Sequence, residues 1–289
     1  MTTIDATLRH ALEVSGRDLI LTLDPALQGL PETAHGGSVL AVFDTLANAP
    51  APREVSGMYR RRVPLGTPLT LLRTHADSTE TFVLSDPVGG VLVDGRVAPL
   101  AARDVARVGD ESSPRPHPPA DDDARSHPLP ISRTCFACGT DNELGLRVQL
   151  TFDAKAVRGT WEPRASFRRD DGSLAPAALT TLLDEAAFWL GALATGESGM
   201  TTELRVSLHR PAPFAAPVTV TGARGAVHQR GDDARYWETD VVARTDGEIV
   251  ATARITYVAV RGAARRLVTG MLAMNDPACV RRVFPAYAR

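Results

Sequence analysis

The chain has few cysteines, few aromatic residues and no excess of positive charge. Its 289 residues include three cysteines, 5% aromatic residues, and 32 basic against 34 acidic residues, for a formal charge of −2. Three cysteines are too few, and odd in number, for a secreted disulfide framework, so reduced thiols are expected. The balanced charge provides no basic field for nucleic acid or anionic lipid, and neither is expected as a partner.

Targeting signals are also lacking. Residues 1–9 contain no basic segment followed by the apolar stretch of a secretion signal. The most apolar run, residues 179–193, contains Asp184 and Glu185, so it falls short of the roughly 20 uncharged apolar residues that cross a bilayer. We expect a cytoplasmic protein with no membrane partner.

The length and one biased segment predict two domains. A typical domain uses roughly 150 residues, which gives about two for this chain. Residues 101–133 are rich in proline and aspartate and have no apolar period, which predicts a flexible linker. We therefore expect an N-terminal unit over residues 1–100, a C-terminal unit over 134–261 and a polar tail over 262–289.

The two units have the same order of predicted elements, which indicates an internal repeat. Each contains a strand, one helix and then four strands without a further helix, which favours an α+β fold with a curved antiparallel sheet around each helix over a parallel βαβ sheet. The predicted helices cover residues 36–47 and 176–193. The predicted strands are 19–23, 55–63, 69–74, 79–85 and 91–98 in the first unit, and 146–152, 201–209, 218–223, 236–243 and 249–260 in the second. Three landmarks recur in order: Asp44 with Asp184, Pro64 with Pro211, and Arg96 with Arg254.

Several motifs resemble those of one family. They are Cys135-Phe-Ala-Cys-Gly-Thr-Asp-Asn-Glu-Leu-Gly-Leu146, Leu182-Leu-Asp-Glu-Ala186, Arg205-Val-Ser-Leu-His-Arg-Pro211 and, in the first unit, Ala34-His-Gly-Gly-Ser-Val-Leu-Ala-Val-Phe-Asp44. Together they resemble the hotdog-fold acyl-CoA thioesterases of the phenylacetic-acid-pathway type. The resemblance implies a double hotdog that hydrolyses an acyl-CoA or acyl-carrier thioester without a cofactor. It also implies that such units can associate into homo-oligomers.

Thioester hydrolysis needs donors for a developing oxyanion and a group that directs or deprotonates water. Gly36 and Gly37 start the first predicted helix, where backbone N–H groups are unpaired and the helix dipole is positive. A plain helix entry turn is the alternative interpretation. The resemblance implies that one unit supplies this helix start and the other supplies the acid, here Asp184. The opposite site would pair Asp44 with residues 175–177, where Pro176 has no N–H, so we expect it to be impaired.

Further residues are assigned by the resemblance. Thr201 corresponds to a Ser or Thr that holds the nucleophilic water, and the matching place in the first unit is Glu54. Thr202 is the adjacent alternative, and both threonines are compatible with an ordinary strand. Gln28 is near the place of a family Asn or Gln but is one residue out of register, and His35 is expected to shape the turn rather than to act as a base.

Two neighbouring sets of charges leave alternatives open. Adjacent helix residues point about 100° apart, so at most one of Asp184 and Glu185 is expected to face the site, with Glu185 either at its edge or on a solvated face. Residues 60–62 are three arginines that suit coenzyme A phosphates, but strand alternation would turn Arg61 away from the other two, and a solvated edge is equally compatible.

Other chemistries are less well supported by the sequence. The Cys135-x2-Cys138 pair resembles half a zinc site, but Cys279 is the only other cysteine and no His-x3–5-His pattern follows, so no metal is expected. Enoyl-thioester hydration in hotdog proteins uses an Asp-x4-His pair, whereas Ala49 and Trp189 stand at the corresponding places here. A non-catalytic acyl-thioester-binding or assembly protein remains the alternative to a hydrolase.

Overall fold

A computed structural model describes residues 2–15, 18–100 and 125–287 of the chain. Most of the expected linker, residues 101–124, lies outside this range. Both predicted helices are confirmed, as α2 (Gly36–Ala47) and α4 (Pro176–Thr195). Each ends on a residue in the left-handed conformation, Asn48 after α2 and Gly196 after α4, which closes the last turn.

The described strands form one antiparallel 14-stranded sheet. From the N-terminal part come β1 (Leu12–Ser15), β2 (Asp18–Thr22), β3 (Arg53–Tyr59), β4 (Pro68–Ala76), β5 (Thr79–Ser85) and β6 (Val91–Pro99). From the C-terminal part come β7 (His127–Pro128), β8 (Thr151–Phe152), β9 (Ala156–Trp161), β10 (Gly199–Leu208), β11 (Val218–Ala223), β12 (His228–Gln229), β13 (Tyr236–Thr245) and β14 (Glu248–Ala259).

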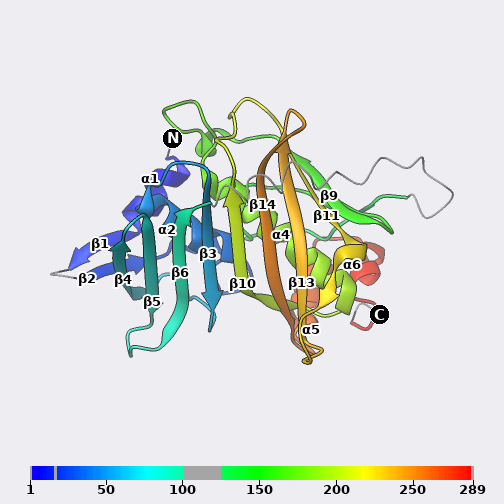
Figure 1. Ribbon diagram of the computed structural model, residues 1–289. Coiled ribbons are helices and arrows are strands. Elements are labelled where there is room, and N and C mark those ends of the chain that lie inside the picture. Colours follow the sequence, from blue (N-terminus) through cyan, green and yellow to red (C-terminus); the bar gives the residue numbers. More distant parts are fainter. Residues whose placement is uncertain (1, 16–17, 101–124, 288–289) are drawn as a thin grey trace.

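The strands from the two parts meet in the middle of the sheet. Their order is β1-β2-β4-β5-β6-β3 and then β10-β14-β13-β11-β9-β8-β7, with β12 paired to β13 (Figure 1). At the junction, β3 pairs with β10 in a register that places Val55 opposite Val206, and both side chains are fully buried. The sheet therefore continues from the first part of the chain into the second.

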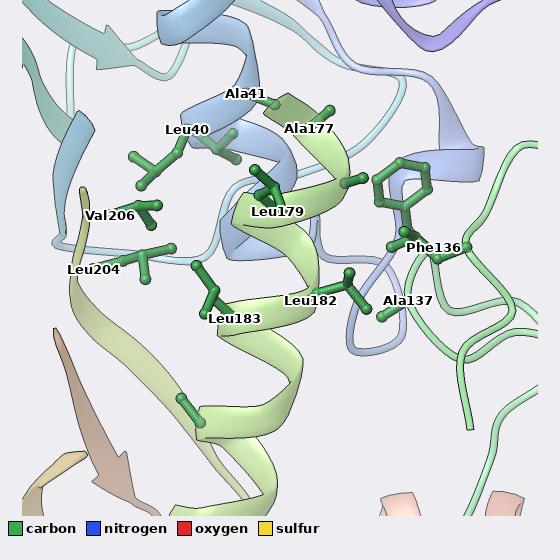
Figure 2. Close-up of a cluster of buried hydrophobic side chains, with 14 of the residues drawn as sticks. Leu40, Ala41, Phe136, Ala137, Ala177, Leu179, Leu182, Leu183, Leu204 and Val206 are labelled. Atoms are coloured by element: carbon green, nitrogen blue, oxygen red, sulfur yellow. The ribbon is translucent and has the colours of Figure 1, made fainter. Parts of the chain in front are cut away.

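Helices α2 and α4 pack against each other on one face of the sheet. Leu179 and Leu183 of α4 point toward Leu40 of α2 and toward Leu204 and Val206 of β10 (Figure 2). Phe136 and Ala137, from the loop that contains the Cys135-x2-Cys138 pair, lie on the opposite side of α4. These side chains are buried and belong to the hydrophobic core.

The two helices approach so closely at Gly37 that a larger residue does not fit. A Cβ atom at this position would lie 2.4 Å from the carbonyl oxygen of Thr180 in α4. The missing side chain lets the start of α2 lie directly against the middle of α4. This crossing places the two helix segments of interest next to each other.

The predicted strand over residues 146–152 is wrong for most of its length. Only Thr151 and Phe152 are in a strand, and the neighbouring strand β9 was not expected from the sequence. The amides of Leu146 and Val148 donate to Phe136 and Ala137 of the cysteine loop, so this segment pairs with the loop instead of with the sheet.

Two terminal segments are more ordered than the sequence pattern indicates. The N-terminus forms α1 (Ile4–His10), and the expected polar tail forms α5 (Ala264–Leu272) and α6 (Pro277–Val283). Val280 and Phe284 are fully buried, and the ring of Phe284 lies 6.4 Å from that of Trp189 in α4. The tail is therefore part of the core. Helix α4 has the length and hydropathy of a membrane span, but 83% of that window is buried inside this fold.

Candidate active site

A cavity of about 850 Å³ opens beside the crossing of α2 and α4. His35 and Gly36 line it from the start of α2, and Asp184 and Glu185 line it from α4. Thr201 and Thr202 line it from β10. Six of the eight residues predicted from the sequence for this site therefore surround one space.

Asp184 is 4% exposed and lies at the centre of a hydrogen-bond network. Its Oδ1 atom accepts a hydrogen bond of 2.7 Å from the Thr201 hydroxyl, and its Oδ2 atom accepts one of 2.9 Å from the Gly37 amide. Burial opposes the charge of this carboxylate, but hydrogen bonds from His35, Thr201 and Gly37 outweigh it and lower its pKa. Asp184 is therefore ionised at neutral pH.

His35 lies between two carboxylates. Its Nδ1 atom is 3.2 Å from Asp184 Oδ2, and its Nε2 atom is 3.4 Å from Glu185 Oε2. Burial favours the neutral imidazole, but the two carboxylates outweigh this effect and raise the pKa of His35 well above its usual value. His35 also occupies the N-cap position of α2, with Nδ1 3.2 Å from the Gly37 amide; because a protonated Nδ1 is a donor, this amide donates to Asp184 Oδ2 instead.

The expectation that at most one of Asp184 and Glu185 faces the site is wrong. Both carboxylates are buried, and both contact His35. The imidazole reaches one carboxylate through each ring nitrogen, so it spans the angle between adjacent helix residues. Trp189, one turn further along α4, donates from Nε1 to Glu185 Oε1 at 2.9 Å and fixes the second carboxylate.

The two glycines at the start of α2 have different environments. The Gly37 amide is occupied by Asp184, and Gly37 does not line the cavity. Gly36 does line it, and within the described part of the chain its amide donates to no acceptor. A Cβ atom on Gly36 would lie 2.7 Å from Asp184 Oδ2, so glycine keeps this approach open. The hydroxyl of Tyr59, which the sequence pattern did not indicate, donates to the Gly36 carbonyl at 2.6 Å.

Two predicted residues have other contacts. The Thr202 hydroxyl donates to the backbone carbonyl of Thr256 at 3.2 Å. Gln28 lies outside the cavity lining, and its side chain donates to Thr134 at 2.6 Å while accepting from the Glu32 amide. Gln28 therefore joins the turn before α2 to the cysteine loop.

The equivalent acid in α2 is paired with an arginine. Asp44 forms a bidentate ion pair with Arg53 of β3, at 2.5 and 2.7 Å, and both residues are buried. We expected Glu54 to be the counterpart of Thr201, but the counterpart is Arg53, the residue before it. Backbone bridges pair Thr33 with Pro64 and Ser173 with Pro213, so the proline that matches Pro64 is Pro213 and not Pro211. This change moves the alignment by two residues, and a β-bulge after Thr201 moves it back by one.

Four exposed arginines line part of the cavity. Arg60, Arg61 and Arg62 all line the cavity, contrary to the expectation that Arg61 turns away. Strand β3 ends at Tyr59, so strand alternation does not govern these three residues. Arg60 pairs with Asp94 at 2.8 Å, and Arg230 adds a fourth guanidinium from the second part of the chain.

One group of side chains in the cavity wall could hold a metal ion. The imidazole of His35, the thiol of Cys135 and the carboxylate of Glu185 are buried, and their ligand atoms lie within 4.8 Å of one another. Their positions in the sequence are too far apart for a spacing pattern to reveal them. Cys138 lies next to Cys135, and their mutual hydrogen bond lowers the pKa of Cys135 and raises that of Cys138.

The fold is that of the hotdog proteins. The sequence matches no family model, and no curated protein sequence matches it. The structure is similar to a candidate thioesterase II from Thermobifida fusca YX, with a TM-score of 0.58 at 18% identity over 90% of this chain and 100% of the other. It is also similar to a conserved hotdog-fold protein from Alicyclobacillus acidocaldarius (0.55, 13%, covering 89% and 97%) and to the acyl-CoA thioesterase II TesB2 from Mycobacterium marinum (0.52, 14%, covering 91% and 100%). A dehydratase, CurJ, shares the fold at a TM-score of 0.54 and 10% identity, so the likeness does not by itself define the chemistry.

Proposed function

We propose that this protein hydrolyses acyl thioesters at one active site formed by both parts of a double hotdog. The observation that supports this most directly is the Asp184–Thr201 pair of the second part, which contacts the start of α2 in the first part: the Gly37 amide binds Asp184, and Gly36 lines the same cavity as Asp184 and Thr201. A buried, ionised carboxylate beside the free backbone amide of Gly36 is the combination that hydrolysis requires.

The duplication is supported by strand order. In the first part the order in the sheet is β2-β4-β5-β6-β3, and in the second it is β9-β11-β13-β14-β10. In both parts the strand before the helix comes first, the three last strands follow in chain order, and the strand directly after the helix lies at the junction. Arg96 of β6 and Arg254 of β14 lie beside Ser56 and Arg205, which pair with each other at the junction. We infer repeat units over residues 1–100 and 134–261. The expected linker over 101–133 does not extend to its last residues, because β7 (His127–Pro128) pairs with β8 of the second part, and the expected tail after residue 261 forms α5 and α6, which pack into the core.

In the proposed reaction, Asp184 takes a proton from water as the water oxygen attacks the thioester carbonyl carbon. The carbonyl oxygen becomes an oxyanion, which the free Gly36 amide at the positive end of α2 stabilises. The Thr201 hydroxyl donates a hydrogen bond to Asp184, so its oxygen is available to accept a hydrogen bond from the same water. The oxyanion then collapses and the C–S bond breaks, and the thiolate leaving group receives the proton that Asp184 took from water, which returns Asp184 to its ionised form.

The cavity suits an acyl thioester of coenzyme A. Met58, Phe188, Leu267 and Met271 provide apolar walls for an acyl chain. The exposed arginines in the lining provide donors for phosphates, and Arg230 among them is also paired with Glu203. An acyl-carrier protein presents a phosphate on the same kind of thiol arm, so both thiols should be assayed. Cytoplasmic location and association into homo-oligomers stay predictions.

The test is thiol release from a panel of acyl-CoA and acyl-carrier thioesters. Wild-type protein should hydrolyse at least one chain-length class, and Asp184→Ala should abolish the release. Equal release by both proteins would contradict the role of Asp184. Tight binding by calorimetry without turnover would contradict hydrolysis and favour the acyl-binding alternative.

A further inference from the structure

We propose that His35, Cys135 and Glu185 form a zinc site in the wall of this cavity. The three side chains come from the turn before α2, from the cysteine loop and from α4, and each is 5% exposed. An imidazole nitrogen, a thiolate sulfur and a carboxylate oxygen are the three ligand types that zinc takes in proteins. The mixed nitrogen, sulfur and oxygen set does not suit magnesium or calcium, which prefer oxygen alone.

The spacing of two of these atoms fits coordination better than a direct ion pair. His35 Nε2 and Glu185 Oε2 are 3.4 Å apart, whereas a charged N–H···O hydrogen bond is about 2.7–2.9 Å long. Two tetrahedral ligands at roughly 2.0–2.1 Å from zinc lie about 3.3 Å from each other. A zinc ion between them therefore needs little rearrangement of either side chain.

The other polar atom of each ligand already has a partner. His35 Nδ1 faces Asp184 Oδ2 at 3.2 Å, which leaves Nε2 for the metal. Trp189 Nε1 donates to Glu185 Oε1, which leaves Oε2. In zinc proteins, a carboxylate that hydrogen-bonds to a histidine ligand fixes the orientation of the imidazole. A donor that hydrogen-bonds to a carboxylate ligand does the same for the carboxylate.

The cysteine loop is held in place against the histidine turn. The Phe136 amide donates to the Gln28 carbonyl at 2.6 Å, and Asn142 Nδ2 donates to the Ala26 carbonyl at 2.7 Å. The Ala137 amide donates to Cys135 Sγ at 3.3 Å, which favours the thiolate form that binds metals. Cys135 is thus positioned by hydrogen bonds within its own loop and between this loop and the turn before α2.

The set has three protein ligands and one open position. Cys138 does not belong to the group of atoms within 4.8 Å, so the fourth tetrahedral position is left for water or a substrate atom. All three ligands line the cavity, so this position faces its interior. Zinc with one thiolate and one carboxylate is neutral overall, which suits a buried site. The proposal concerns binding only and does not depend on thioester hydrolysis.

The test is zinc retention by the reduced full-length protein. After incubation with zinc and desalting, elemental analysis should find about one zinc per wild-type chain, and Cys135→Ser and Glu185→Gln should each lower retention at least tenfold. The matched control is Cys279→Ser, because Cys279 is a buried thiol that donates to the Pro128 carbonyl and lies outside the cavity. Cys138→Ser should also retain the metal.

Cobalt gives a second measurement on the wild-type protein, in case a variant fails to fold. Titration with cobalt(II) should produce a thiolate-to-cobalt charge-transfer band and the visible bands of tetrahedral coordination. Failure of wild type to retain zinc, or a cobalt spectrum without a thiolate band, would overturn the proposal. Full retention by folded Cys135→Ser or Glu185→Gln, or loss with Cys138→Ser alone, would overturn this ligand set.

Discussion

Asp44 and Asp184 occupy equivalent places in two helices and have opposite surroundings. Asp44 is bound on both oxygens by Arg53, whereas Asp184 is bound by a hydroxyl, an amide and an imidazole. A guanidinium cancels the charge of a carboxylate and blocks its approach to water. The neighbours, rather than the aspartates themselves, determine which of the two can act as a base.

This contrast predicts opposite effects for one substitution at two positions. Asp184→Asn should lower kcat for thioester hydrolysis by about 10²–10⁴, because the general base is lost. Asp44→Asn should leave kcat per folded molecule unchanged but lower the free energy of unfolding by about 3–5 kcal/mol, because Arg53 is left buried without its partner. Steady-state thiol release and urea unfolding of both variants check this. A loss of kcat in folded Asp44→Asn would contradict the assignment of a single active site.

The adjacent glycines also predict different outcomes. In Gly36→Ala the new Cβ meets Asp184 Oδ2 at 2.7 Å, so kcat should fall while the fold is kept. In Gly37→Ala it meets the backbone of Thr180 at 2.4 Å, which cannot move aside alone. Overpacking of this kind costs about 1–3 kcal/mol. Unfolding and kinetic measurements on both variants should separate a catalytic loss from a stability loss, and equal destabilisation would contradict the distinction.

The sequence pattern predicted the helices and strands whose limits are set by local interactions. Helix α2 and strands β5 and β11 were predicted with their observed bounds, because their apolar periods and turns lie within the segment. Segment 146–150 has the pattern of a strand, but its amides bond to the cysteine loop. The contact of His35 with Glu185 joins residues 150 positions apart, and no spacing rule reports such a contact. Arg53 was missed because aligning the two units on Pro64 and Pro211 gives a register that is wrong by one residue. An error of one residue puts Glu54 in the place of Arg53.

The C-terminal helices are predicted to stabilise the whole domain. Phe284 is fully buried after α6 and lies beside Trp189 of α4. Phe284→Ala should lower the free energy of unfolding by about 3–5 kcal/mol, because a large buried ring is removed. Leu72→Ala on β4 is the control, since Leu72 is 58% exposed and should change stability little. Urea denaturation measures both, and similar small effects would show that the tail is dispensable.

The β4–β5 hairpin predicts a pH-dependent contribution to stability. Arg73 binds Glu80 through two hydrogen bonds of 2.9 Å across the hairpin, and this contact, with His75, lowers the pKa of Glu80. A carboxylate with a lowered folded-state pKa contributes stability above its unfolded pKa of about 4.3, and this contribution is lost as pH falls through the folded value. Glu80→Gln should therefore be less stable than wild type at pH 7, and the difference should shrink below about pH 4. Urea unfolding at several pH values checks this, and a difference independent of pH would contradict it.

One sheet and one pair of helices join the two parts of the chain. Strands β3 and β10 pair over residues 53–58 and 203–208, and α2 crosses α4 where Gly37 meets Thr180. The candidate site lies on this junction, because Gly36 and Asp184 come from opposite sides of it. Separation of the two parts would therefore expose the core and dismantle the site in the same step.

The junction predicts a single cooperative unfolding transition. All three tryptophans, Trp161, Trp189 and Trp237, belong to the second part, so their fluorescence reports that part alone, whereas far-ultraviolet circular dichroism reports both. Because opening the β3–β10 pair would expose Val55 and Val206 in both parts at once, neither part should unfold first. Urea transitions followed by the two probes should coincide in midpoint and slope, which is the test of two-state behaviour. A dichroism midpoint below the fluorescence midpoint would contradict this, because it would show that the first part unfolds independently. The site shared between the parts would then be lost at a urea concentration at which the second part is still folded.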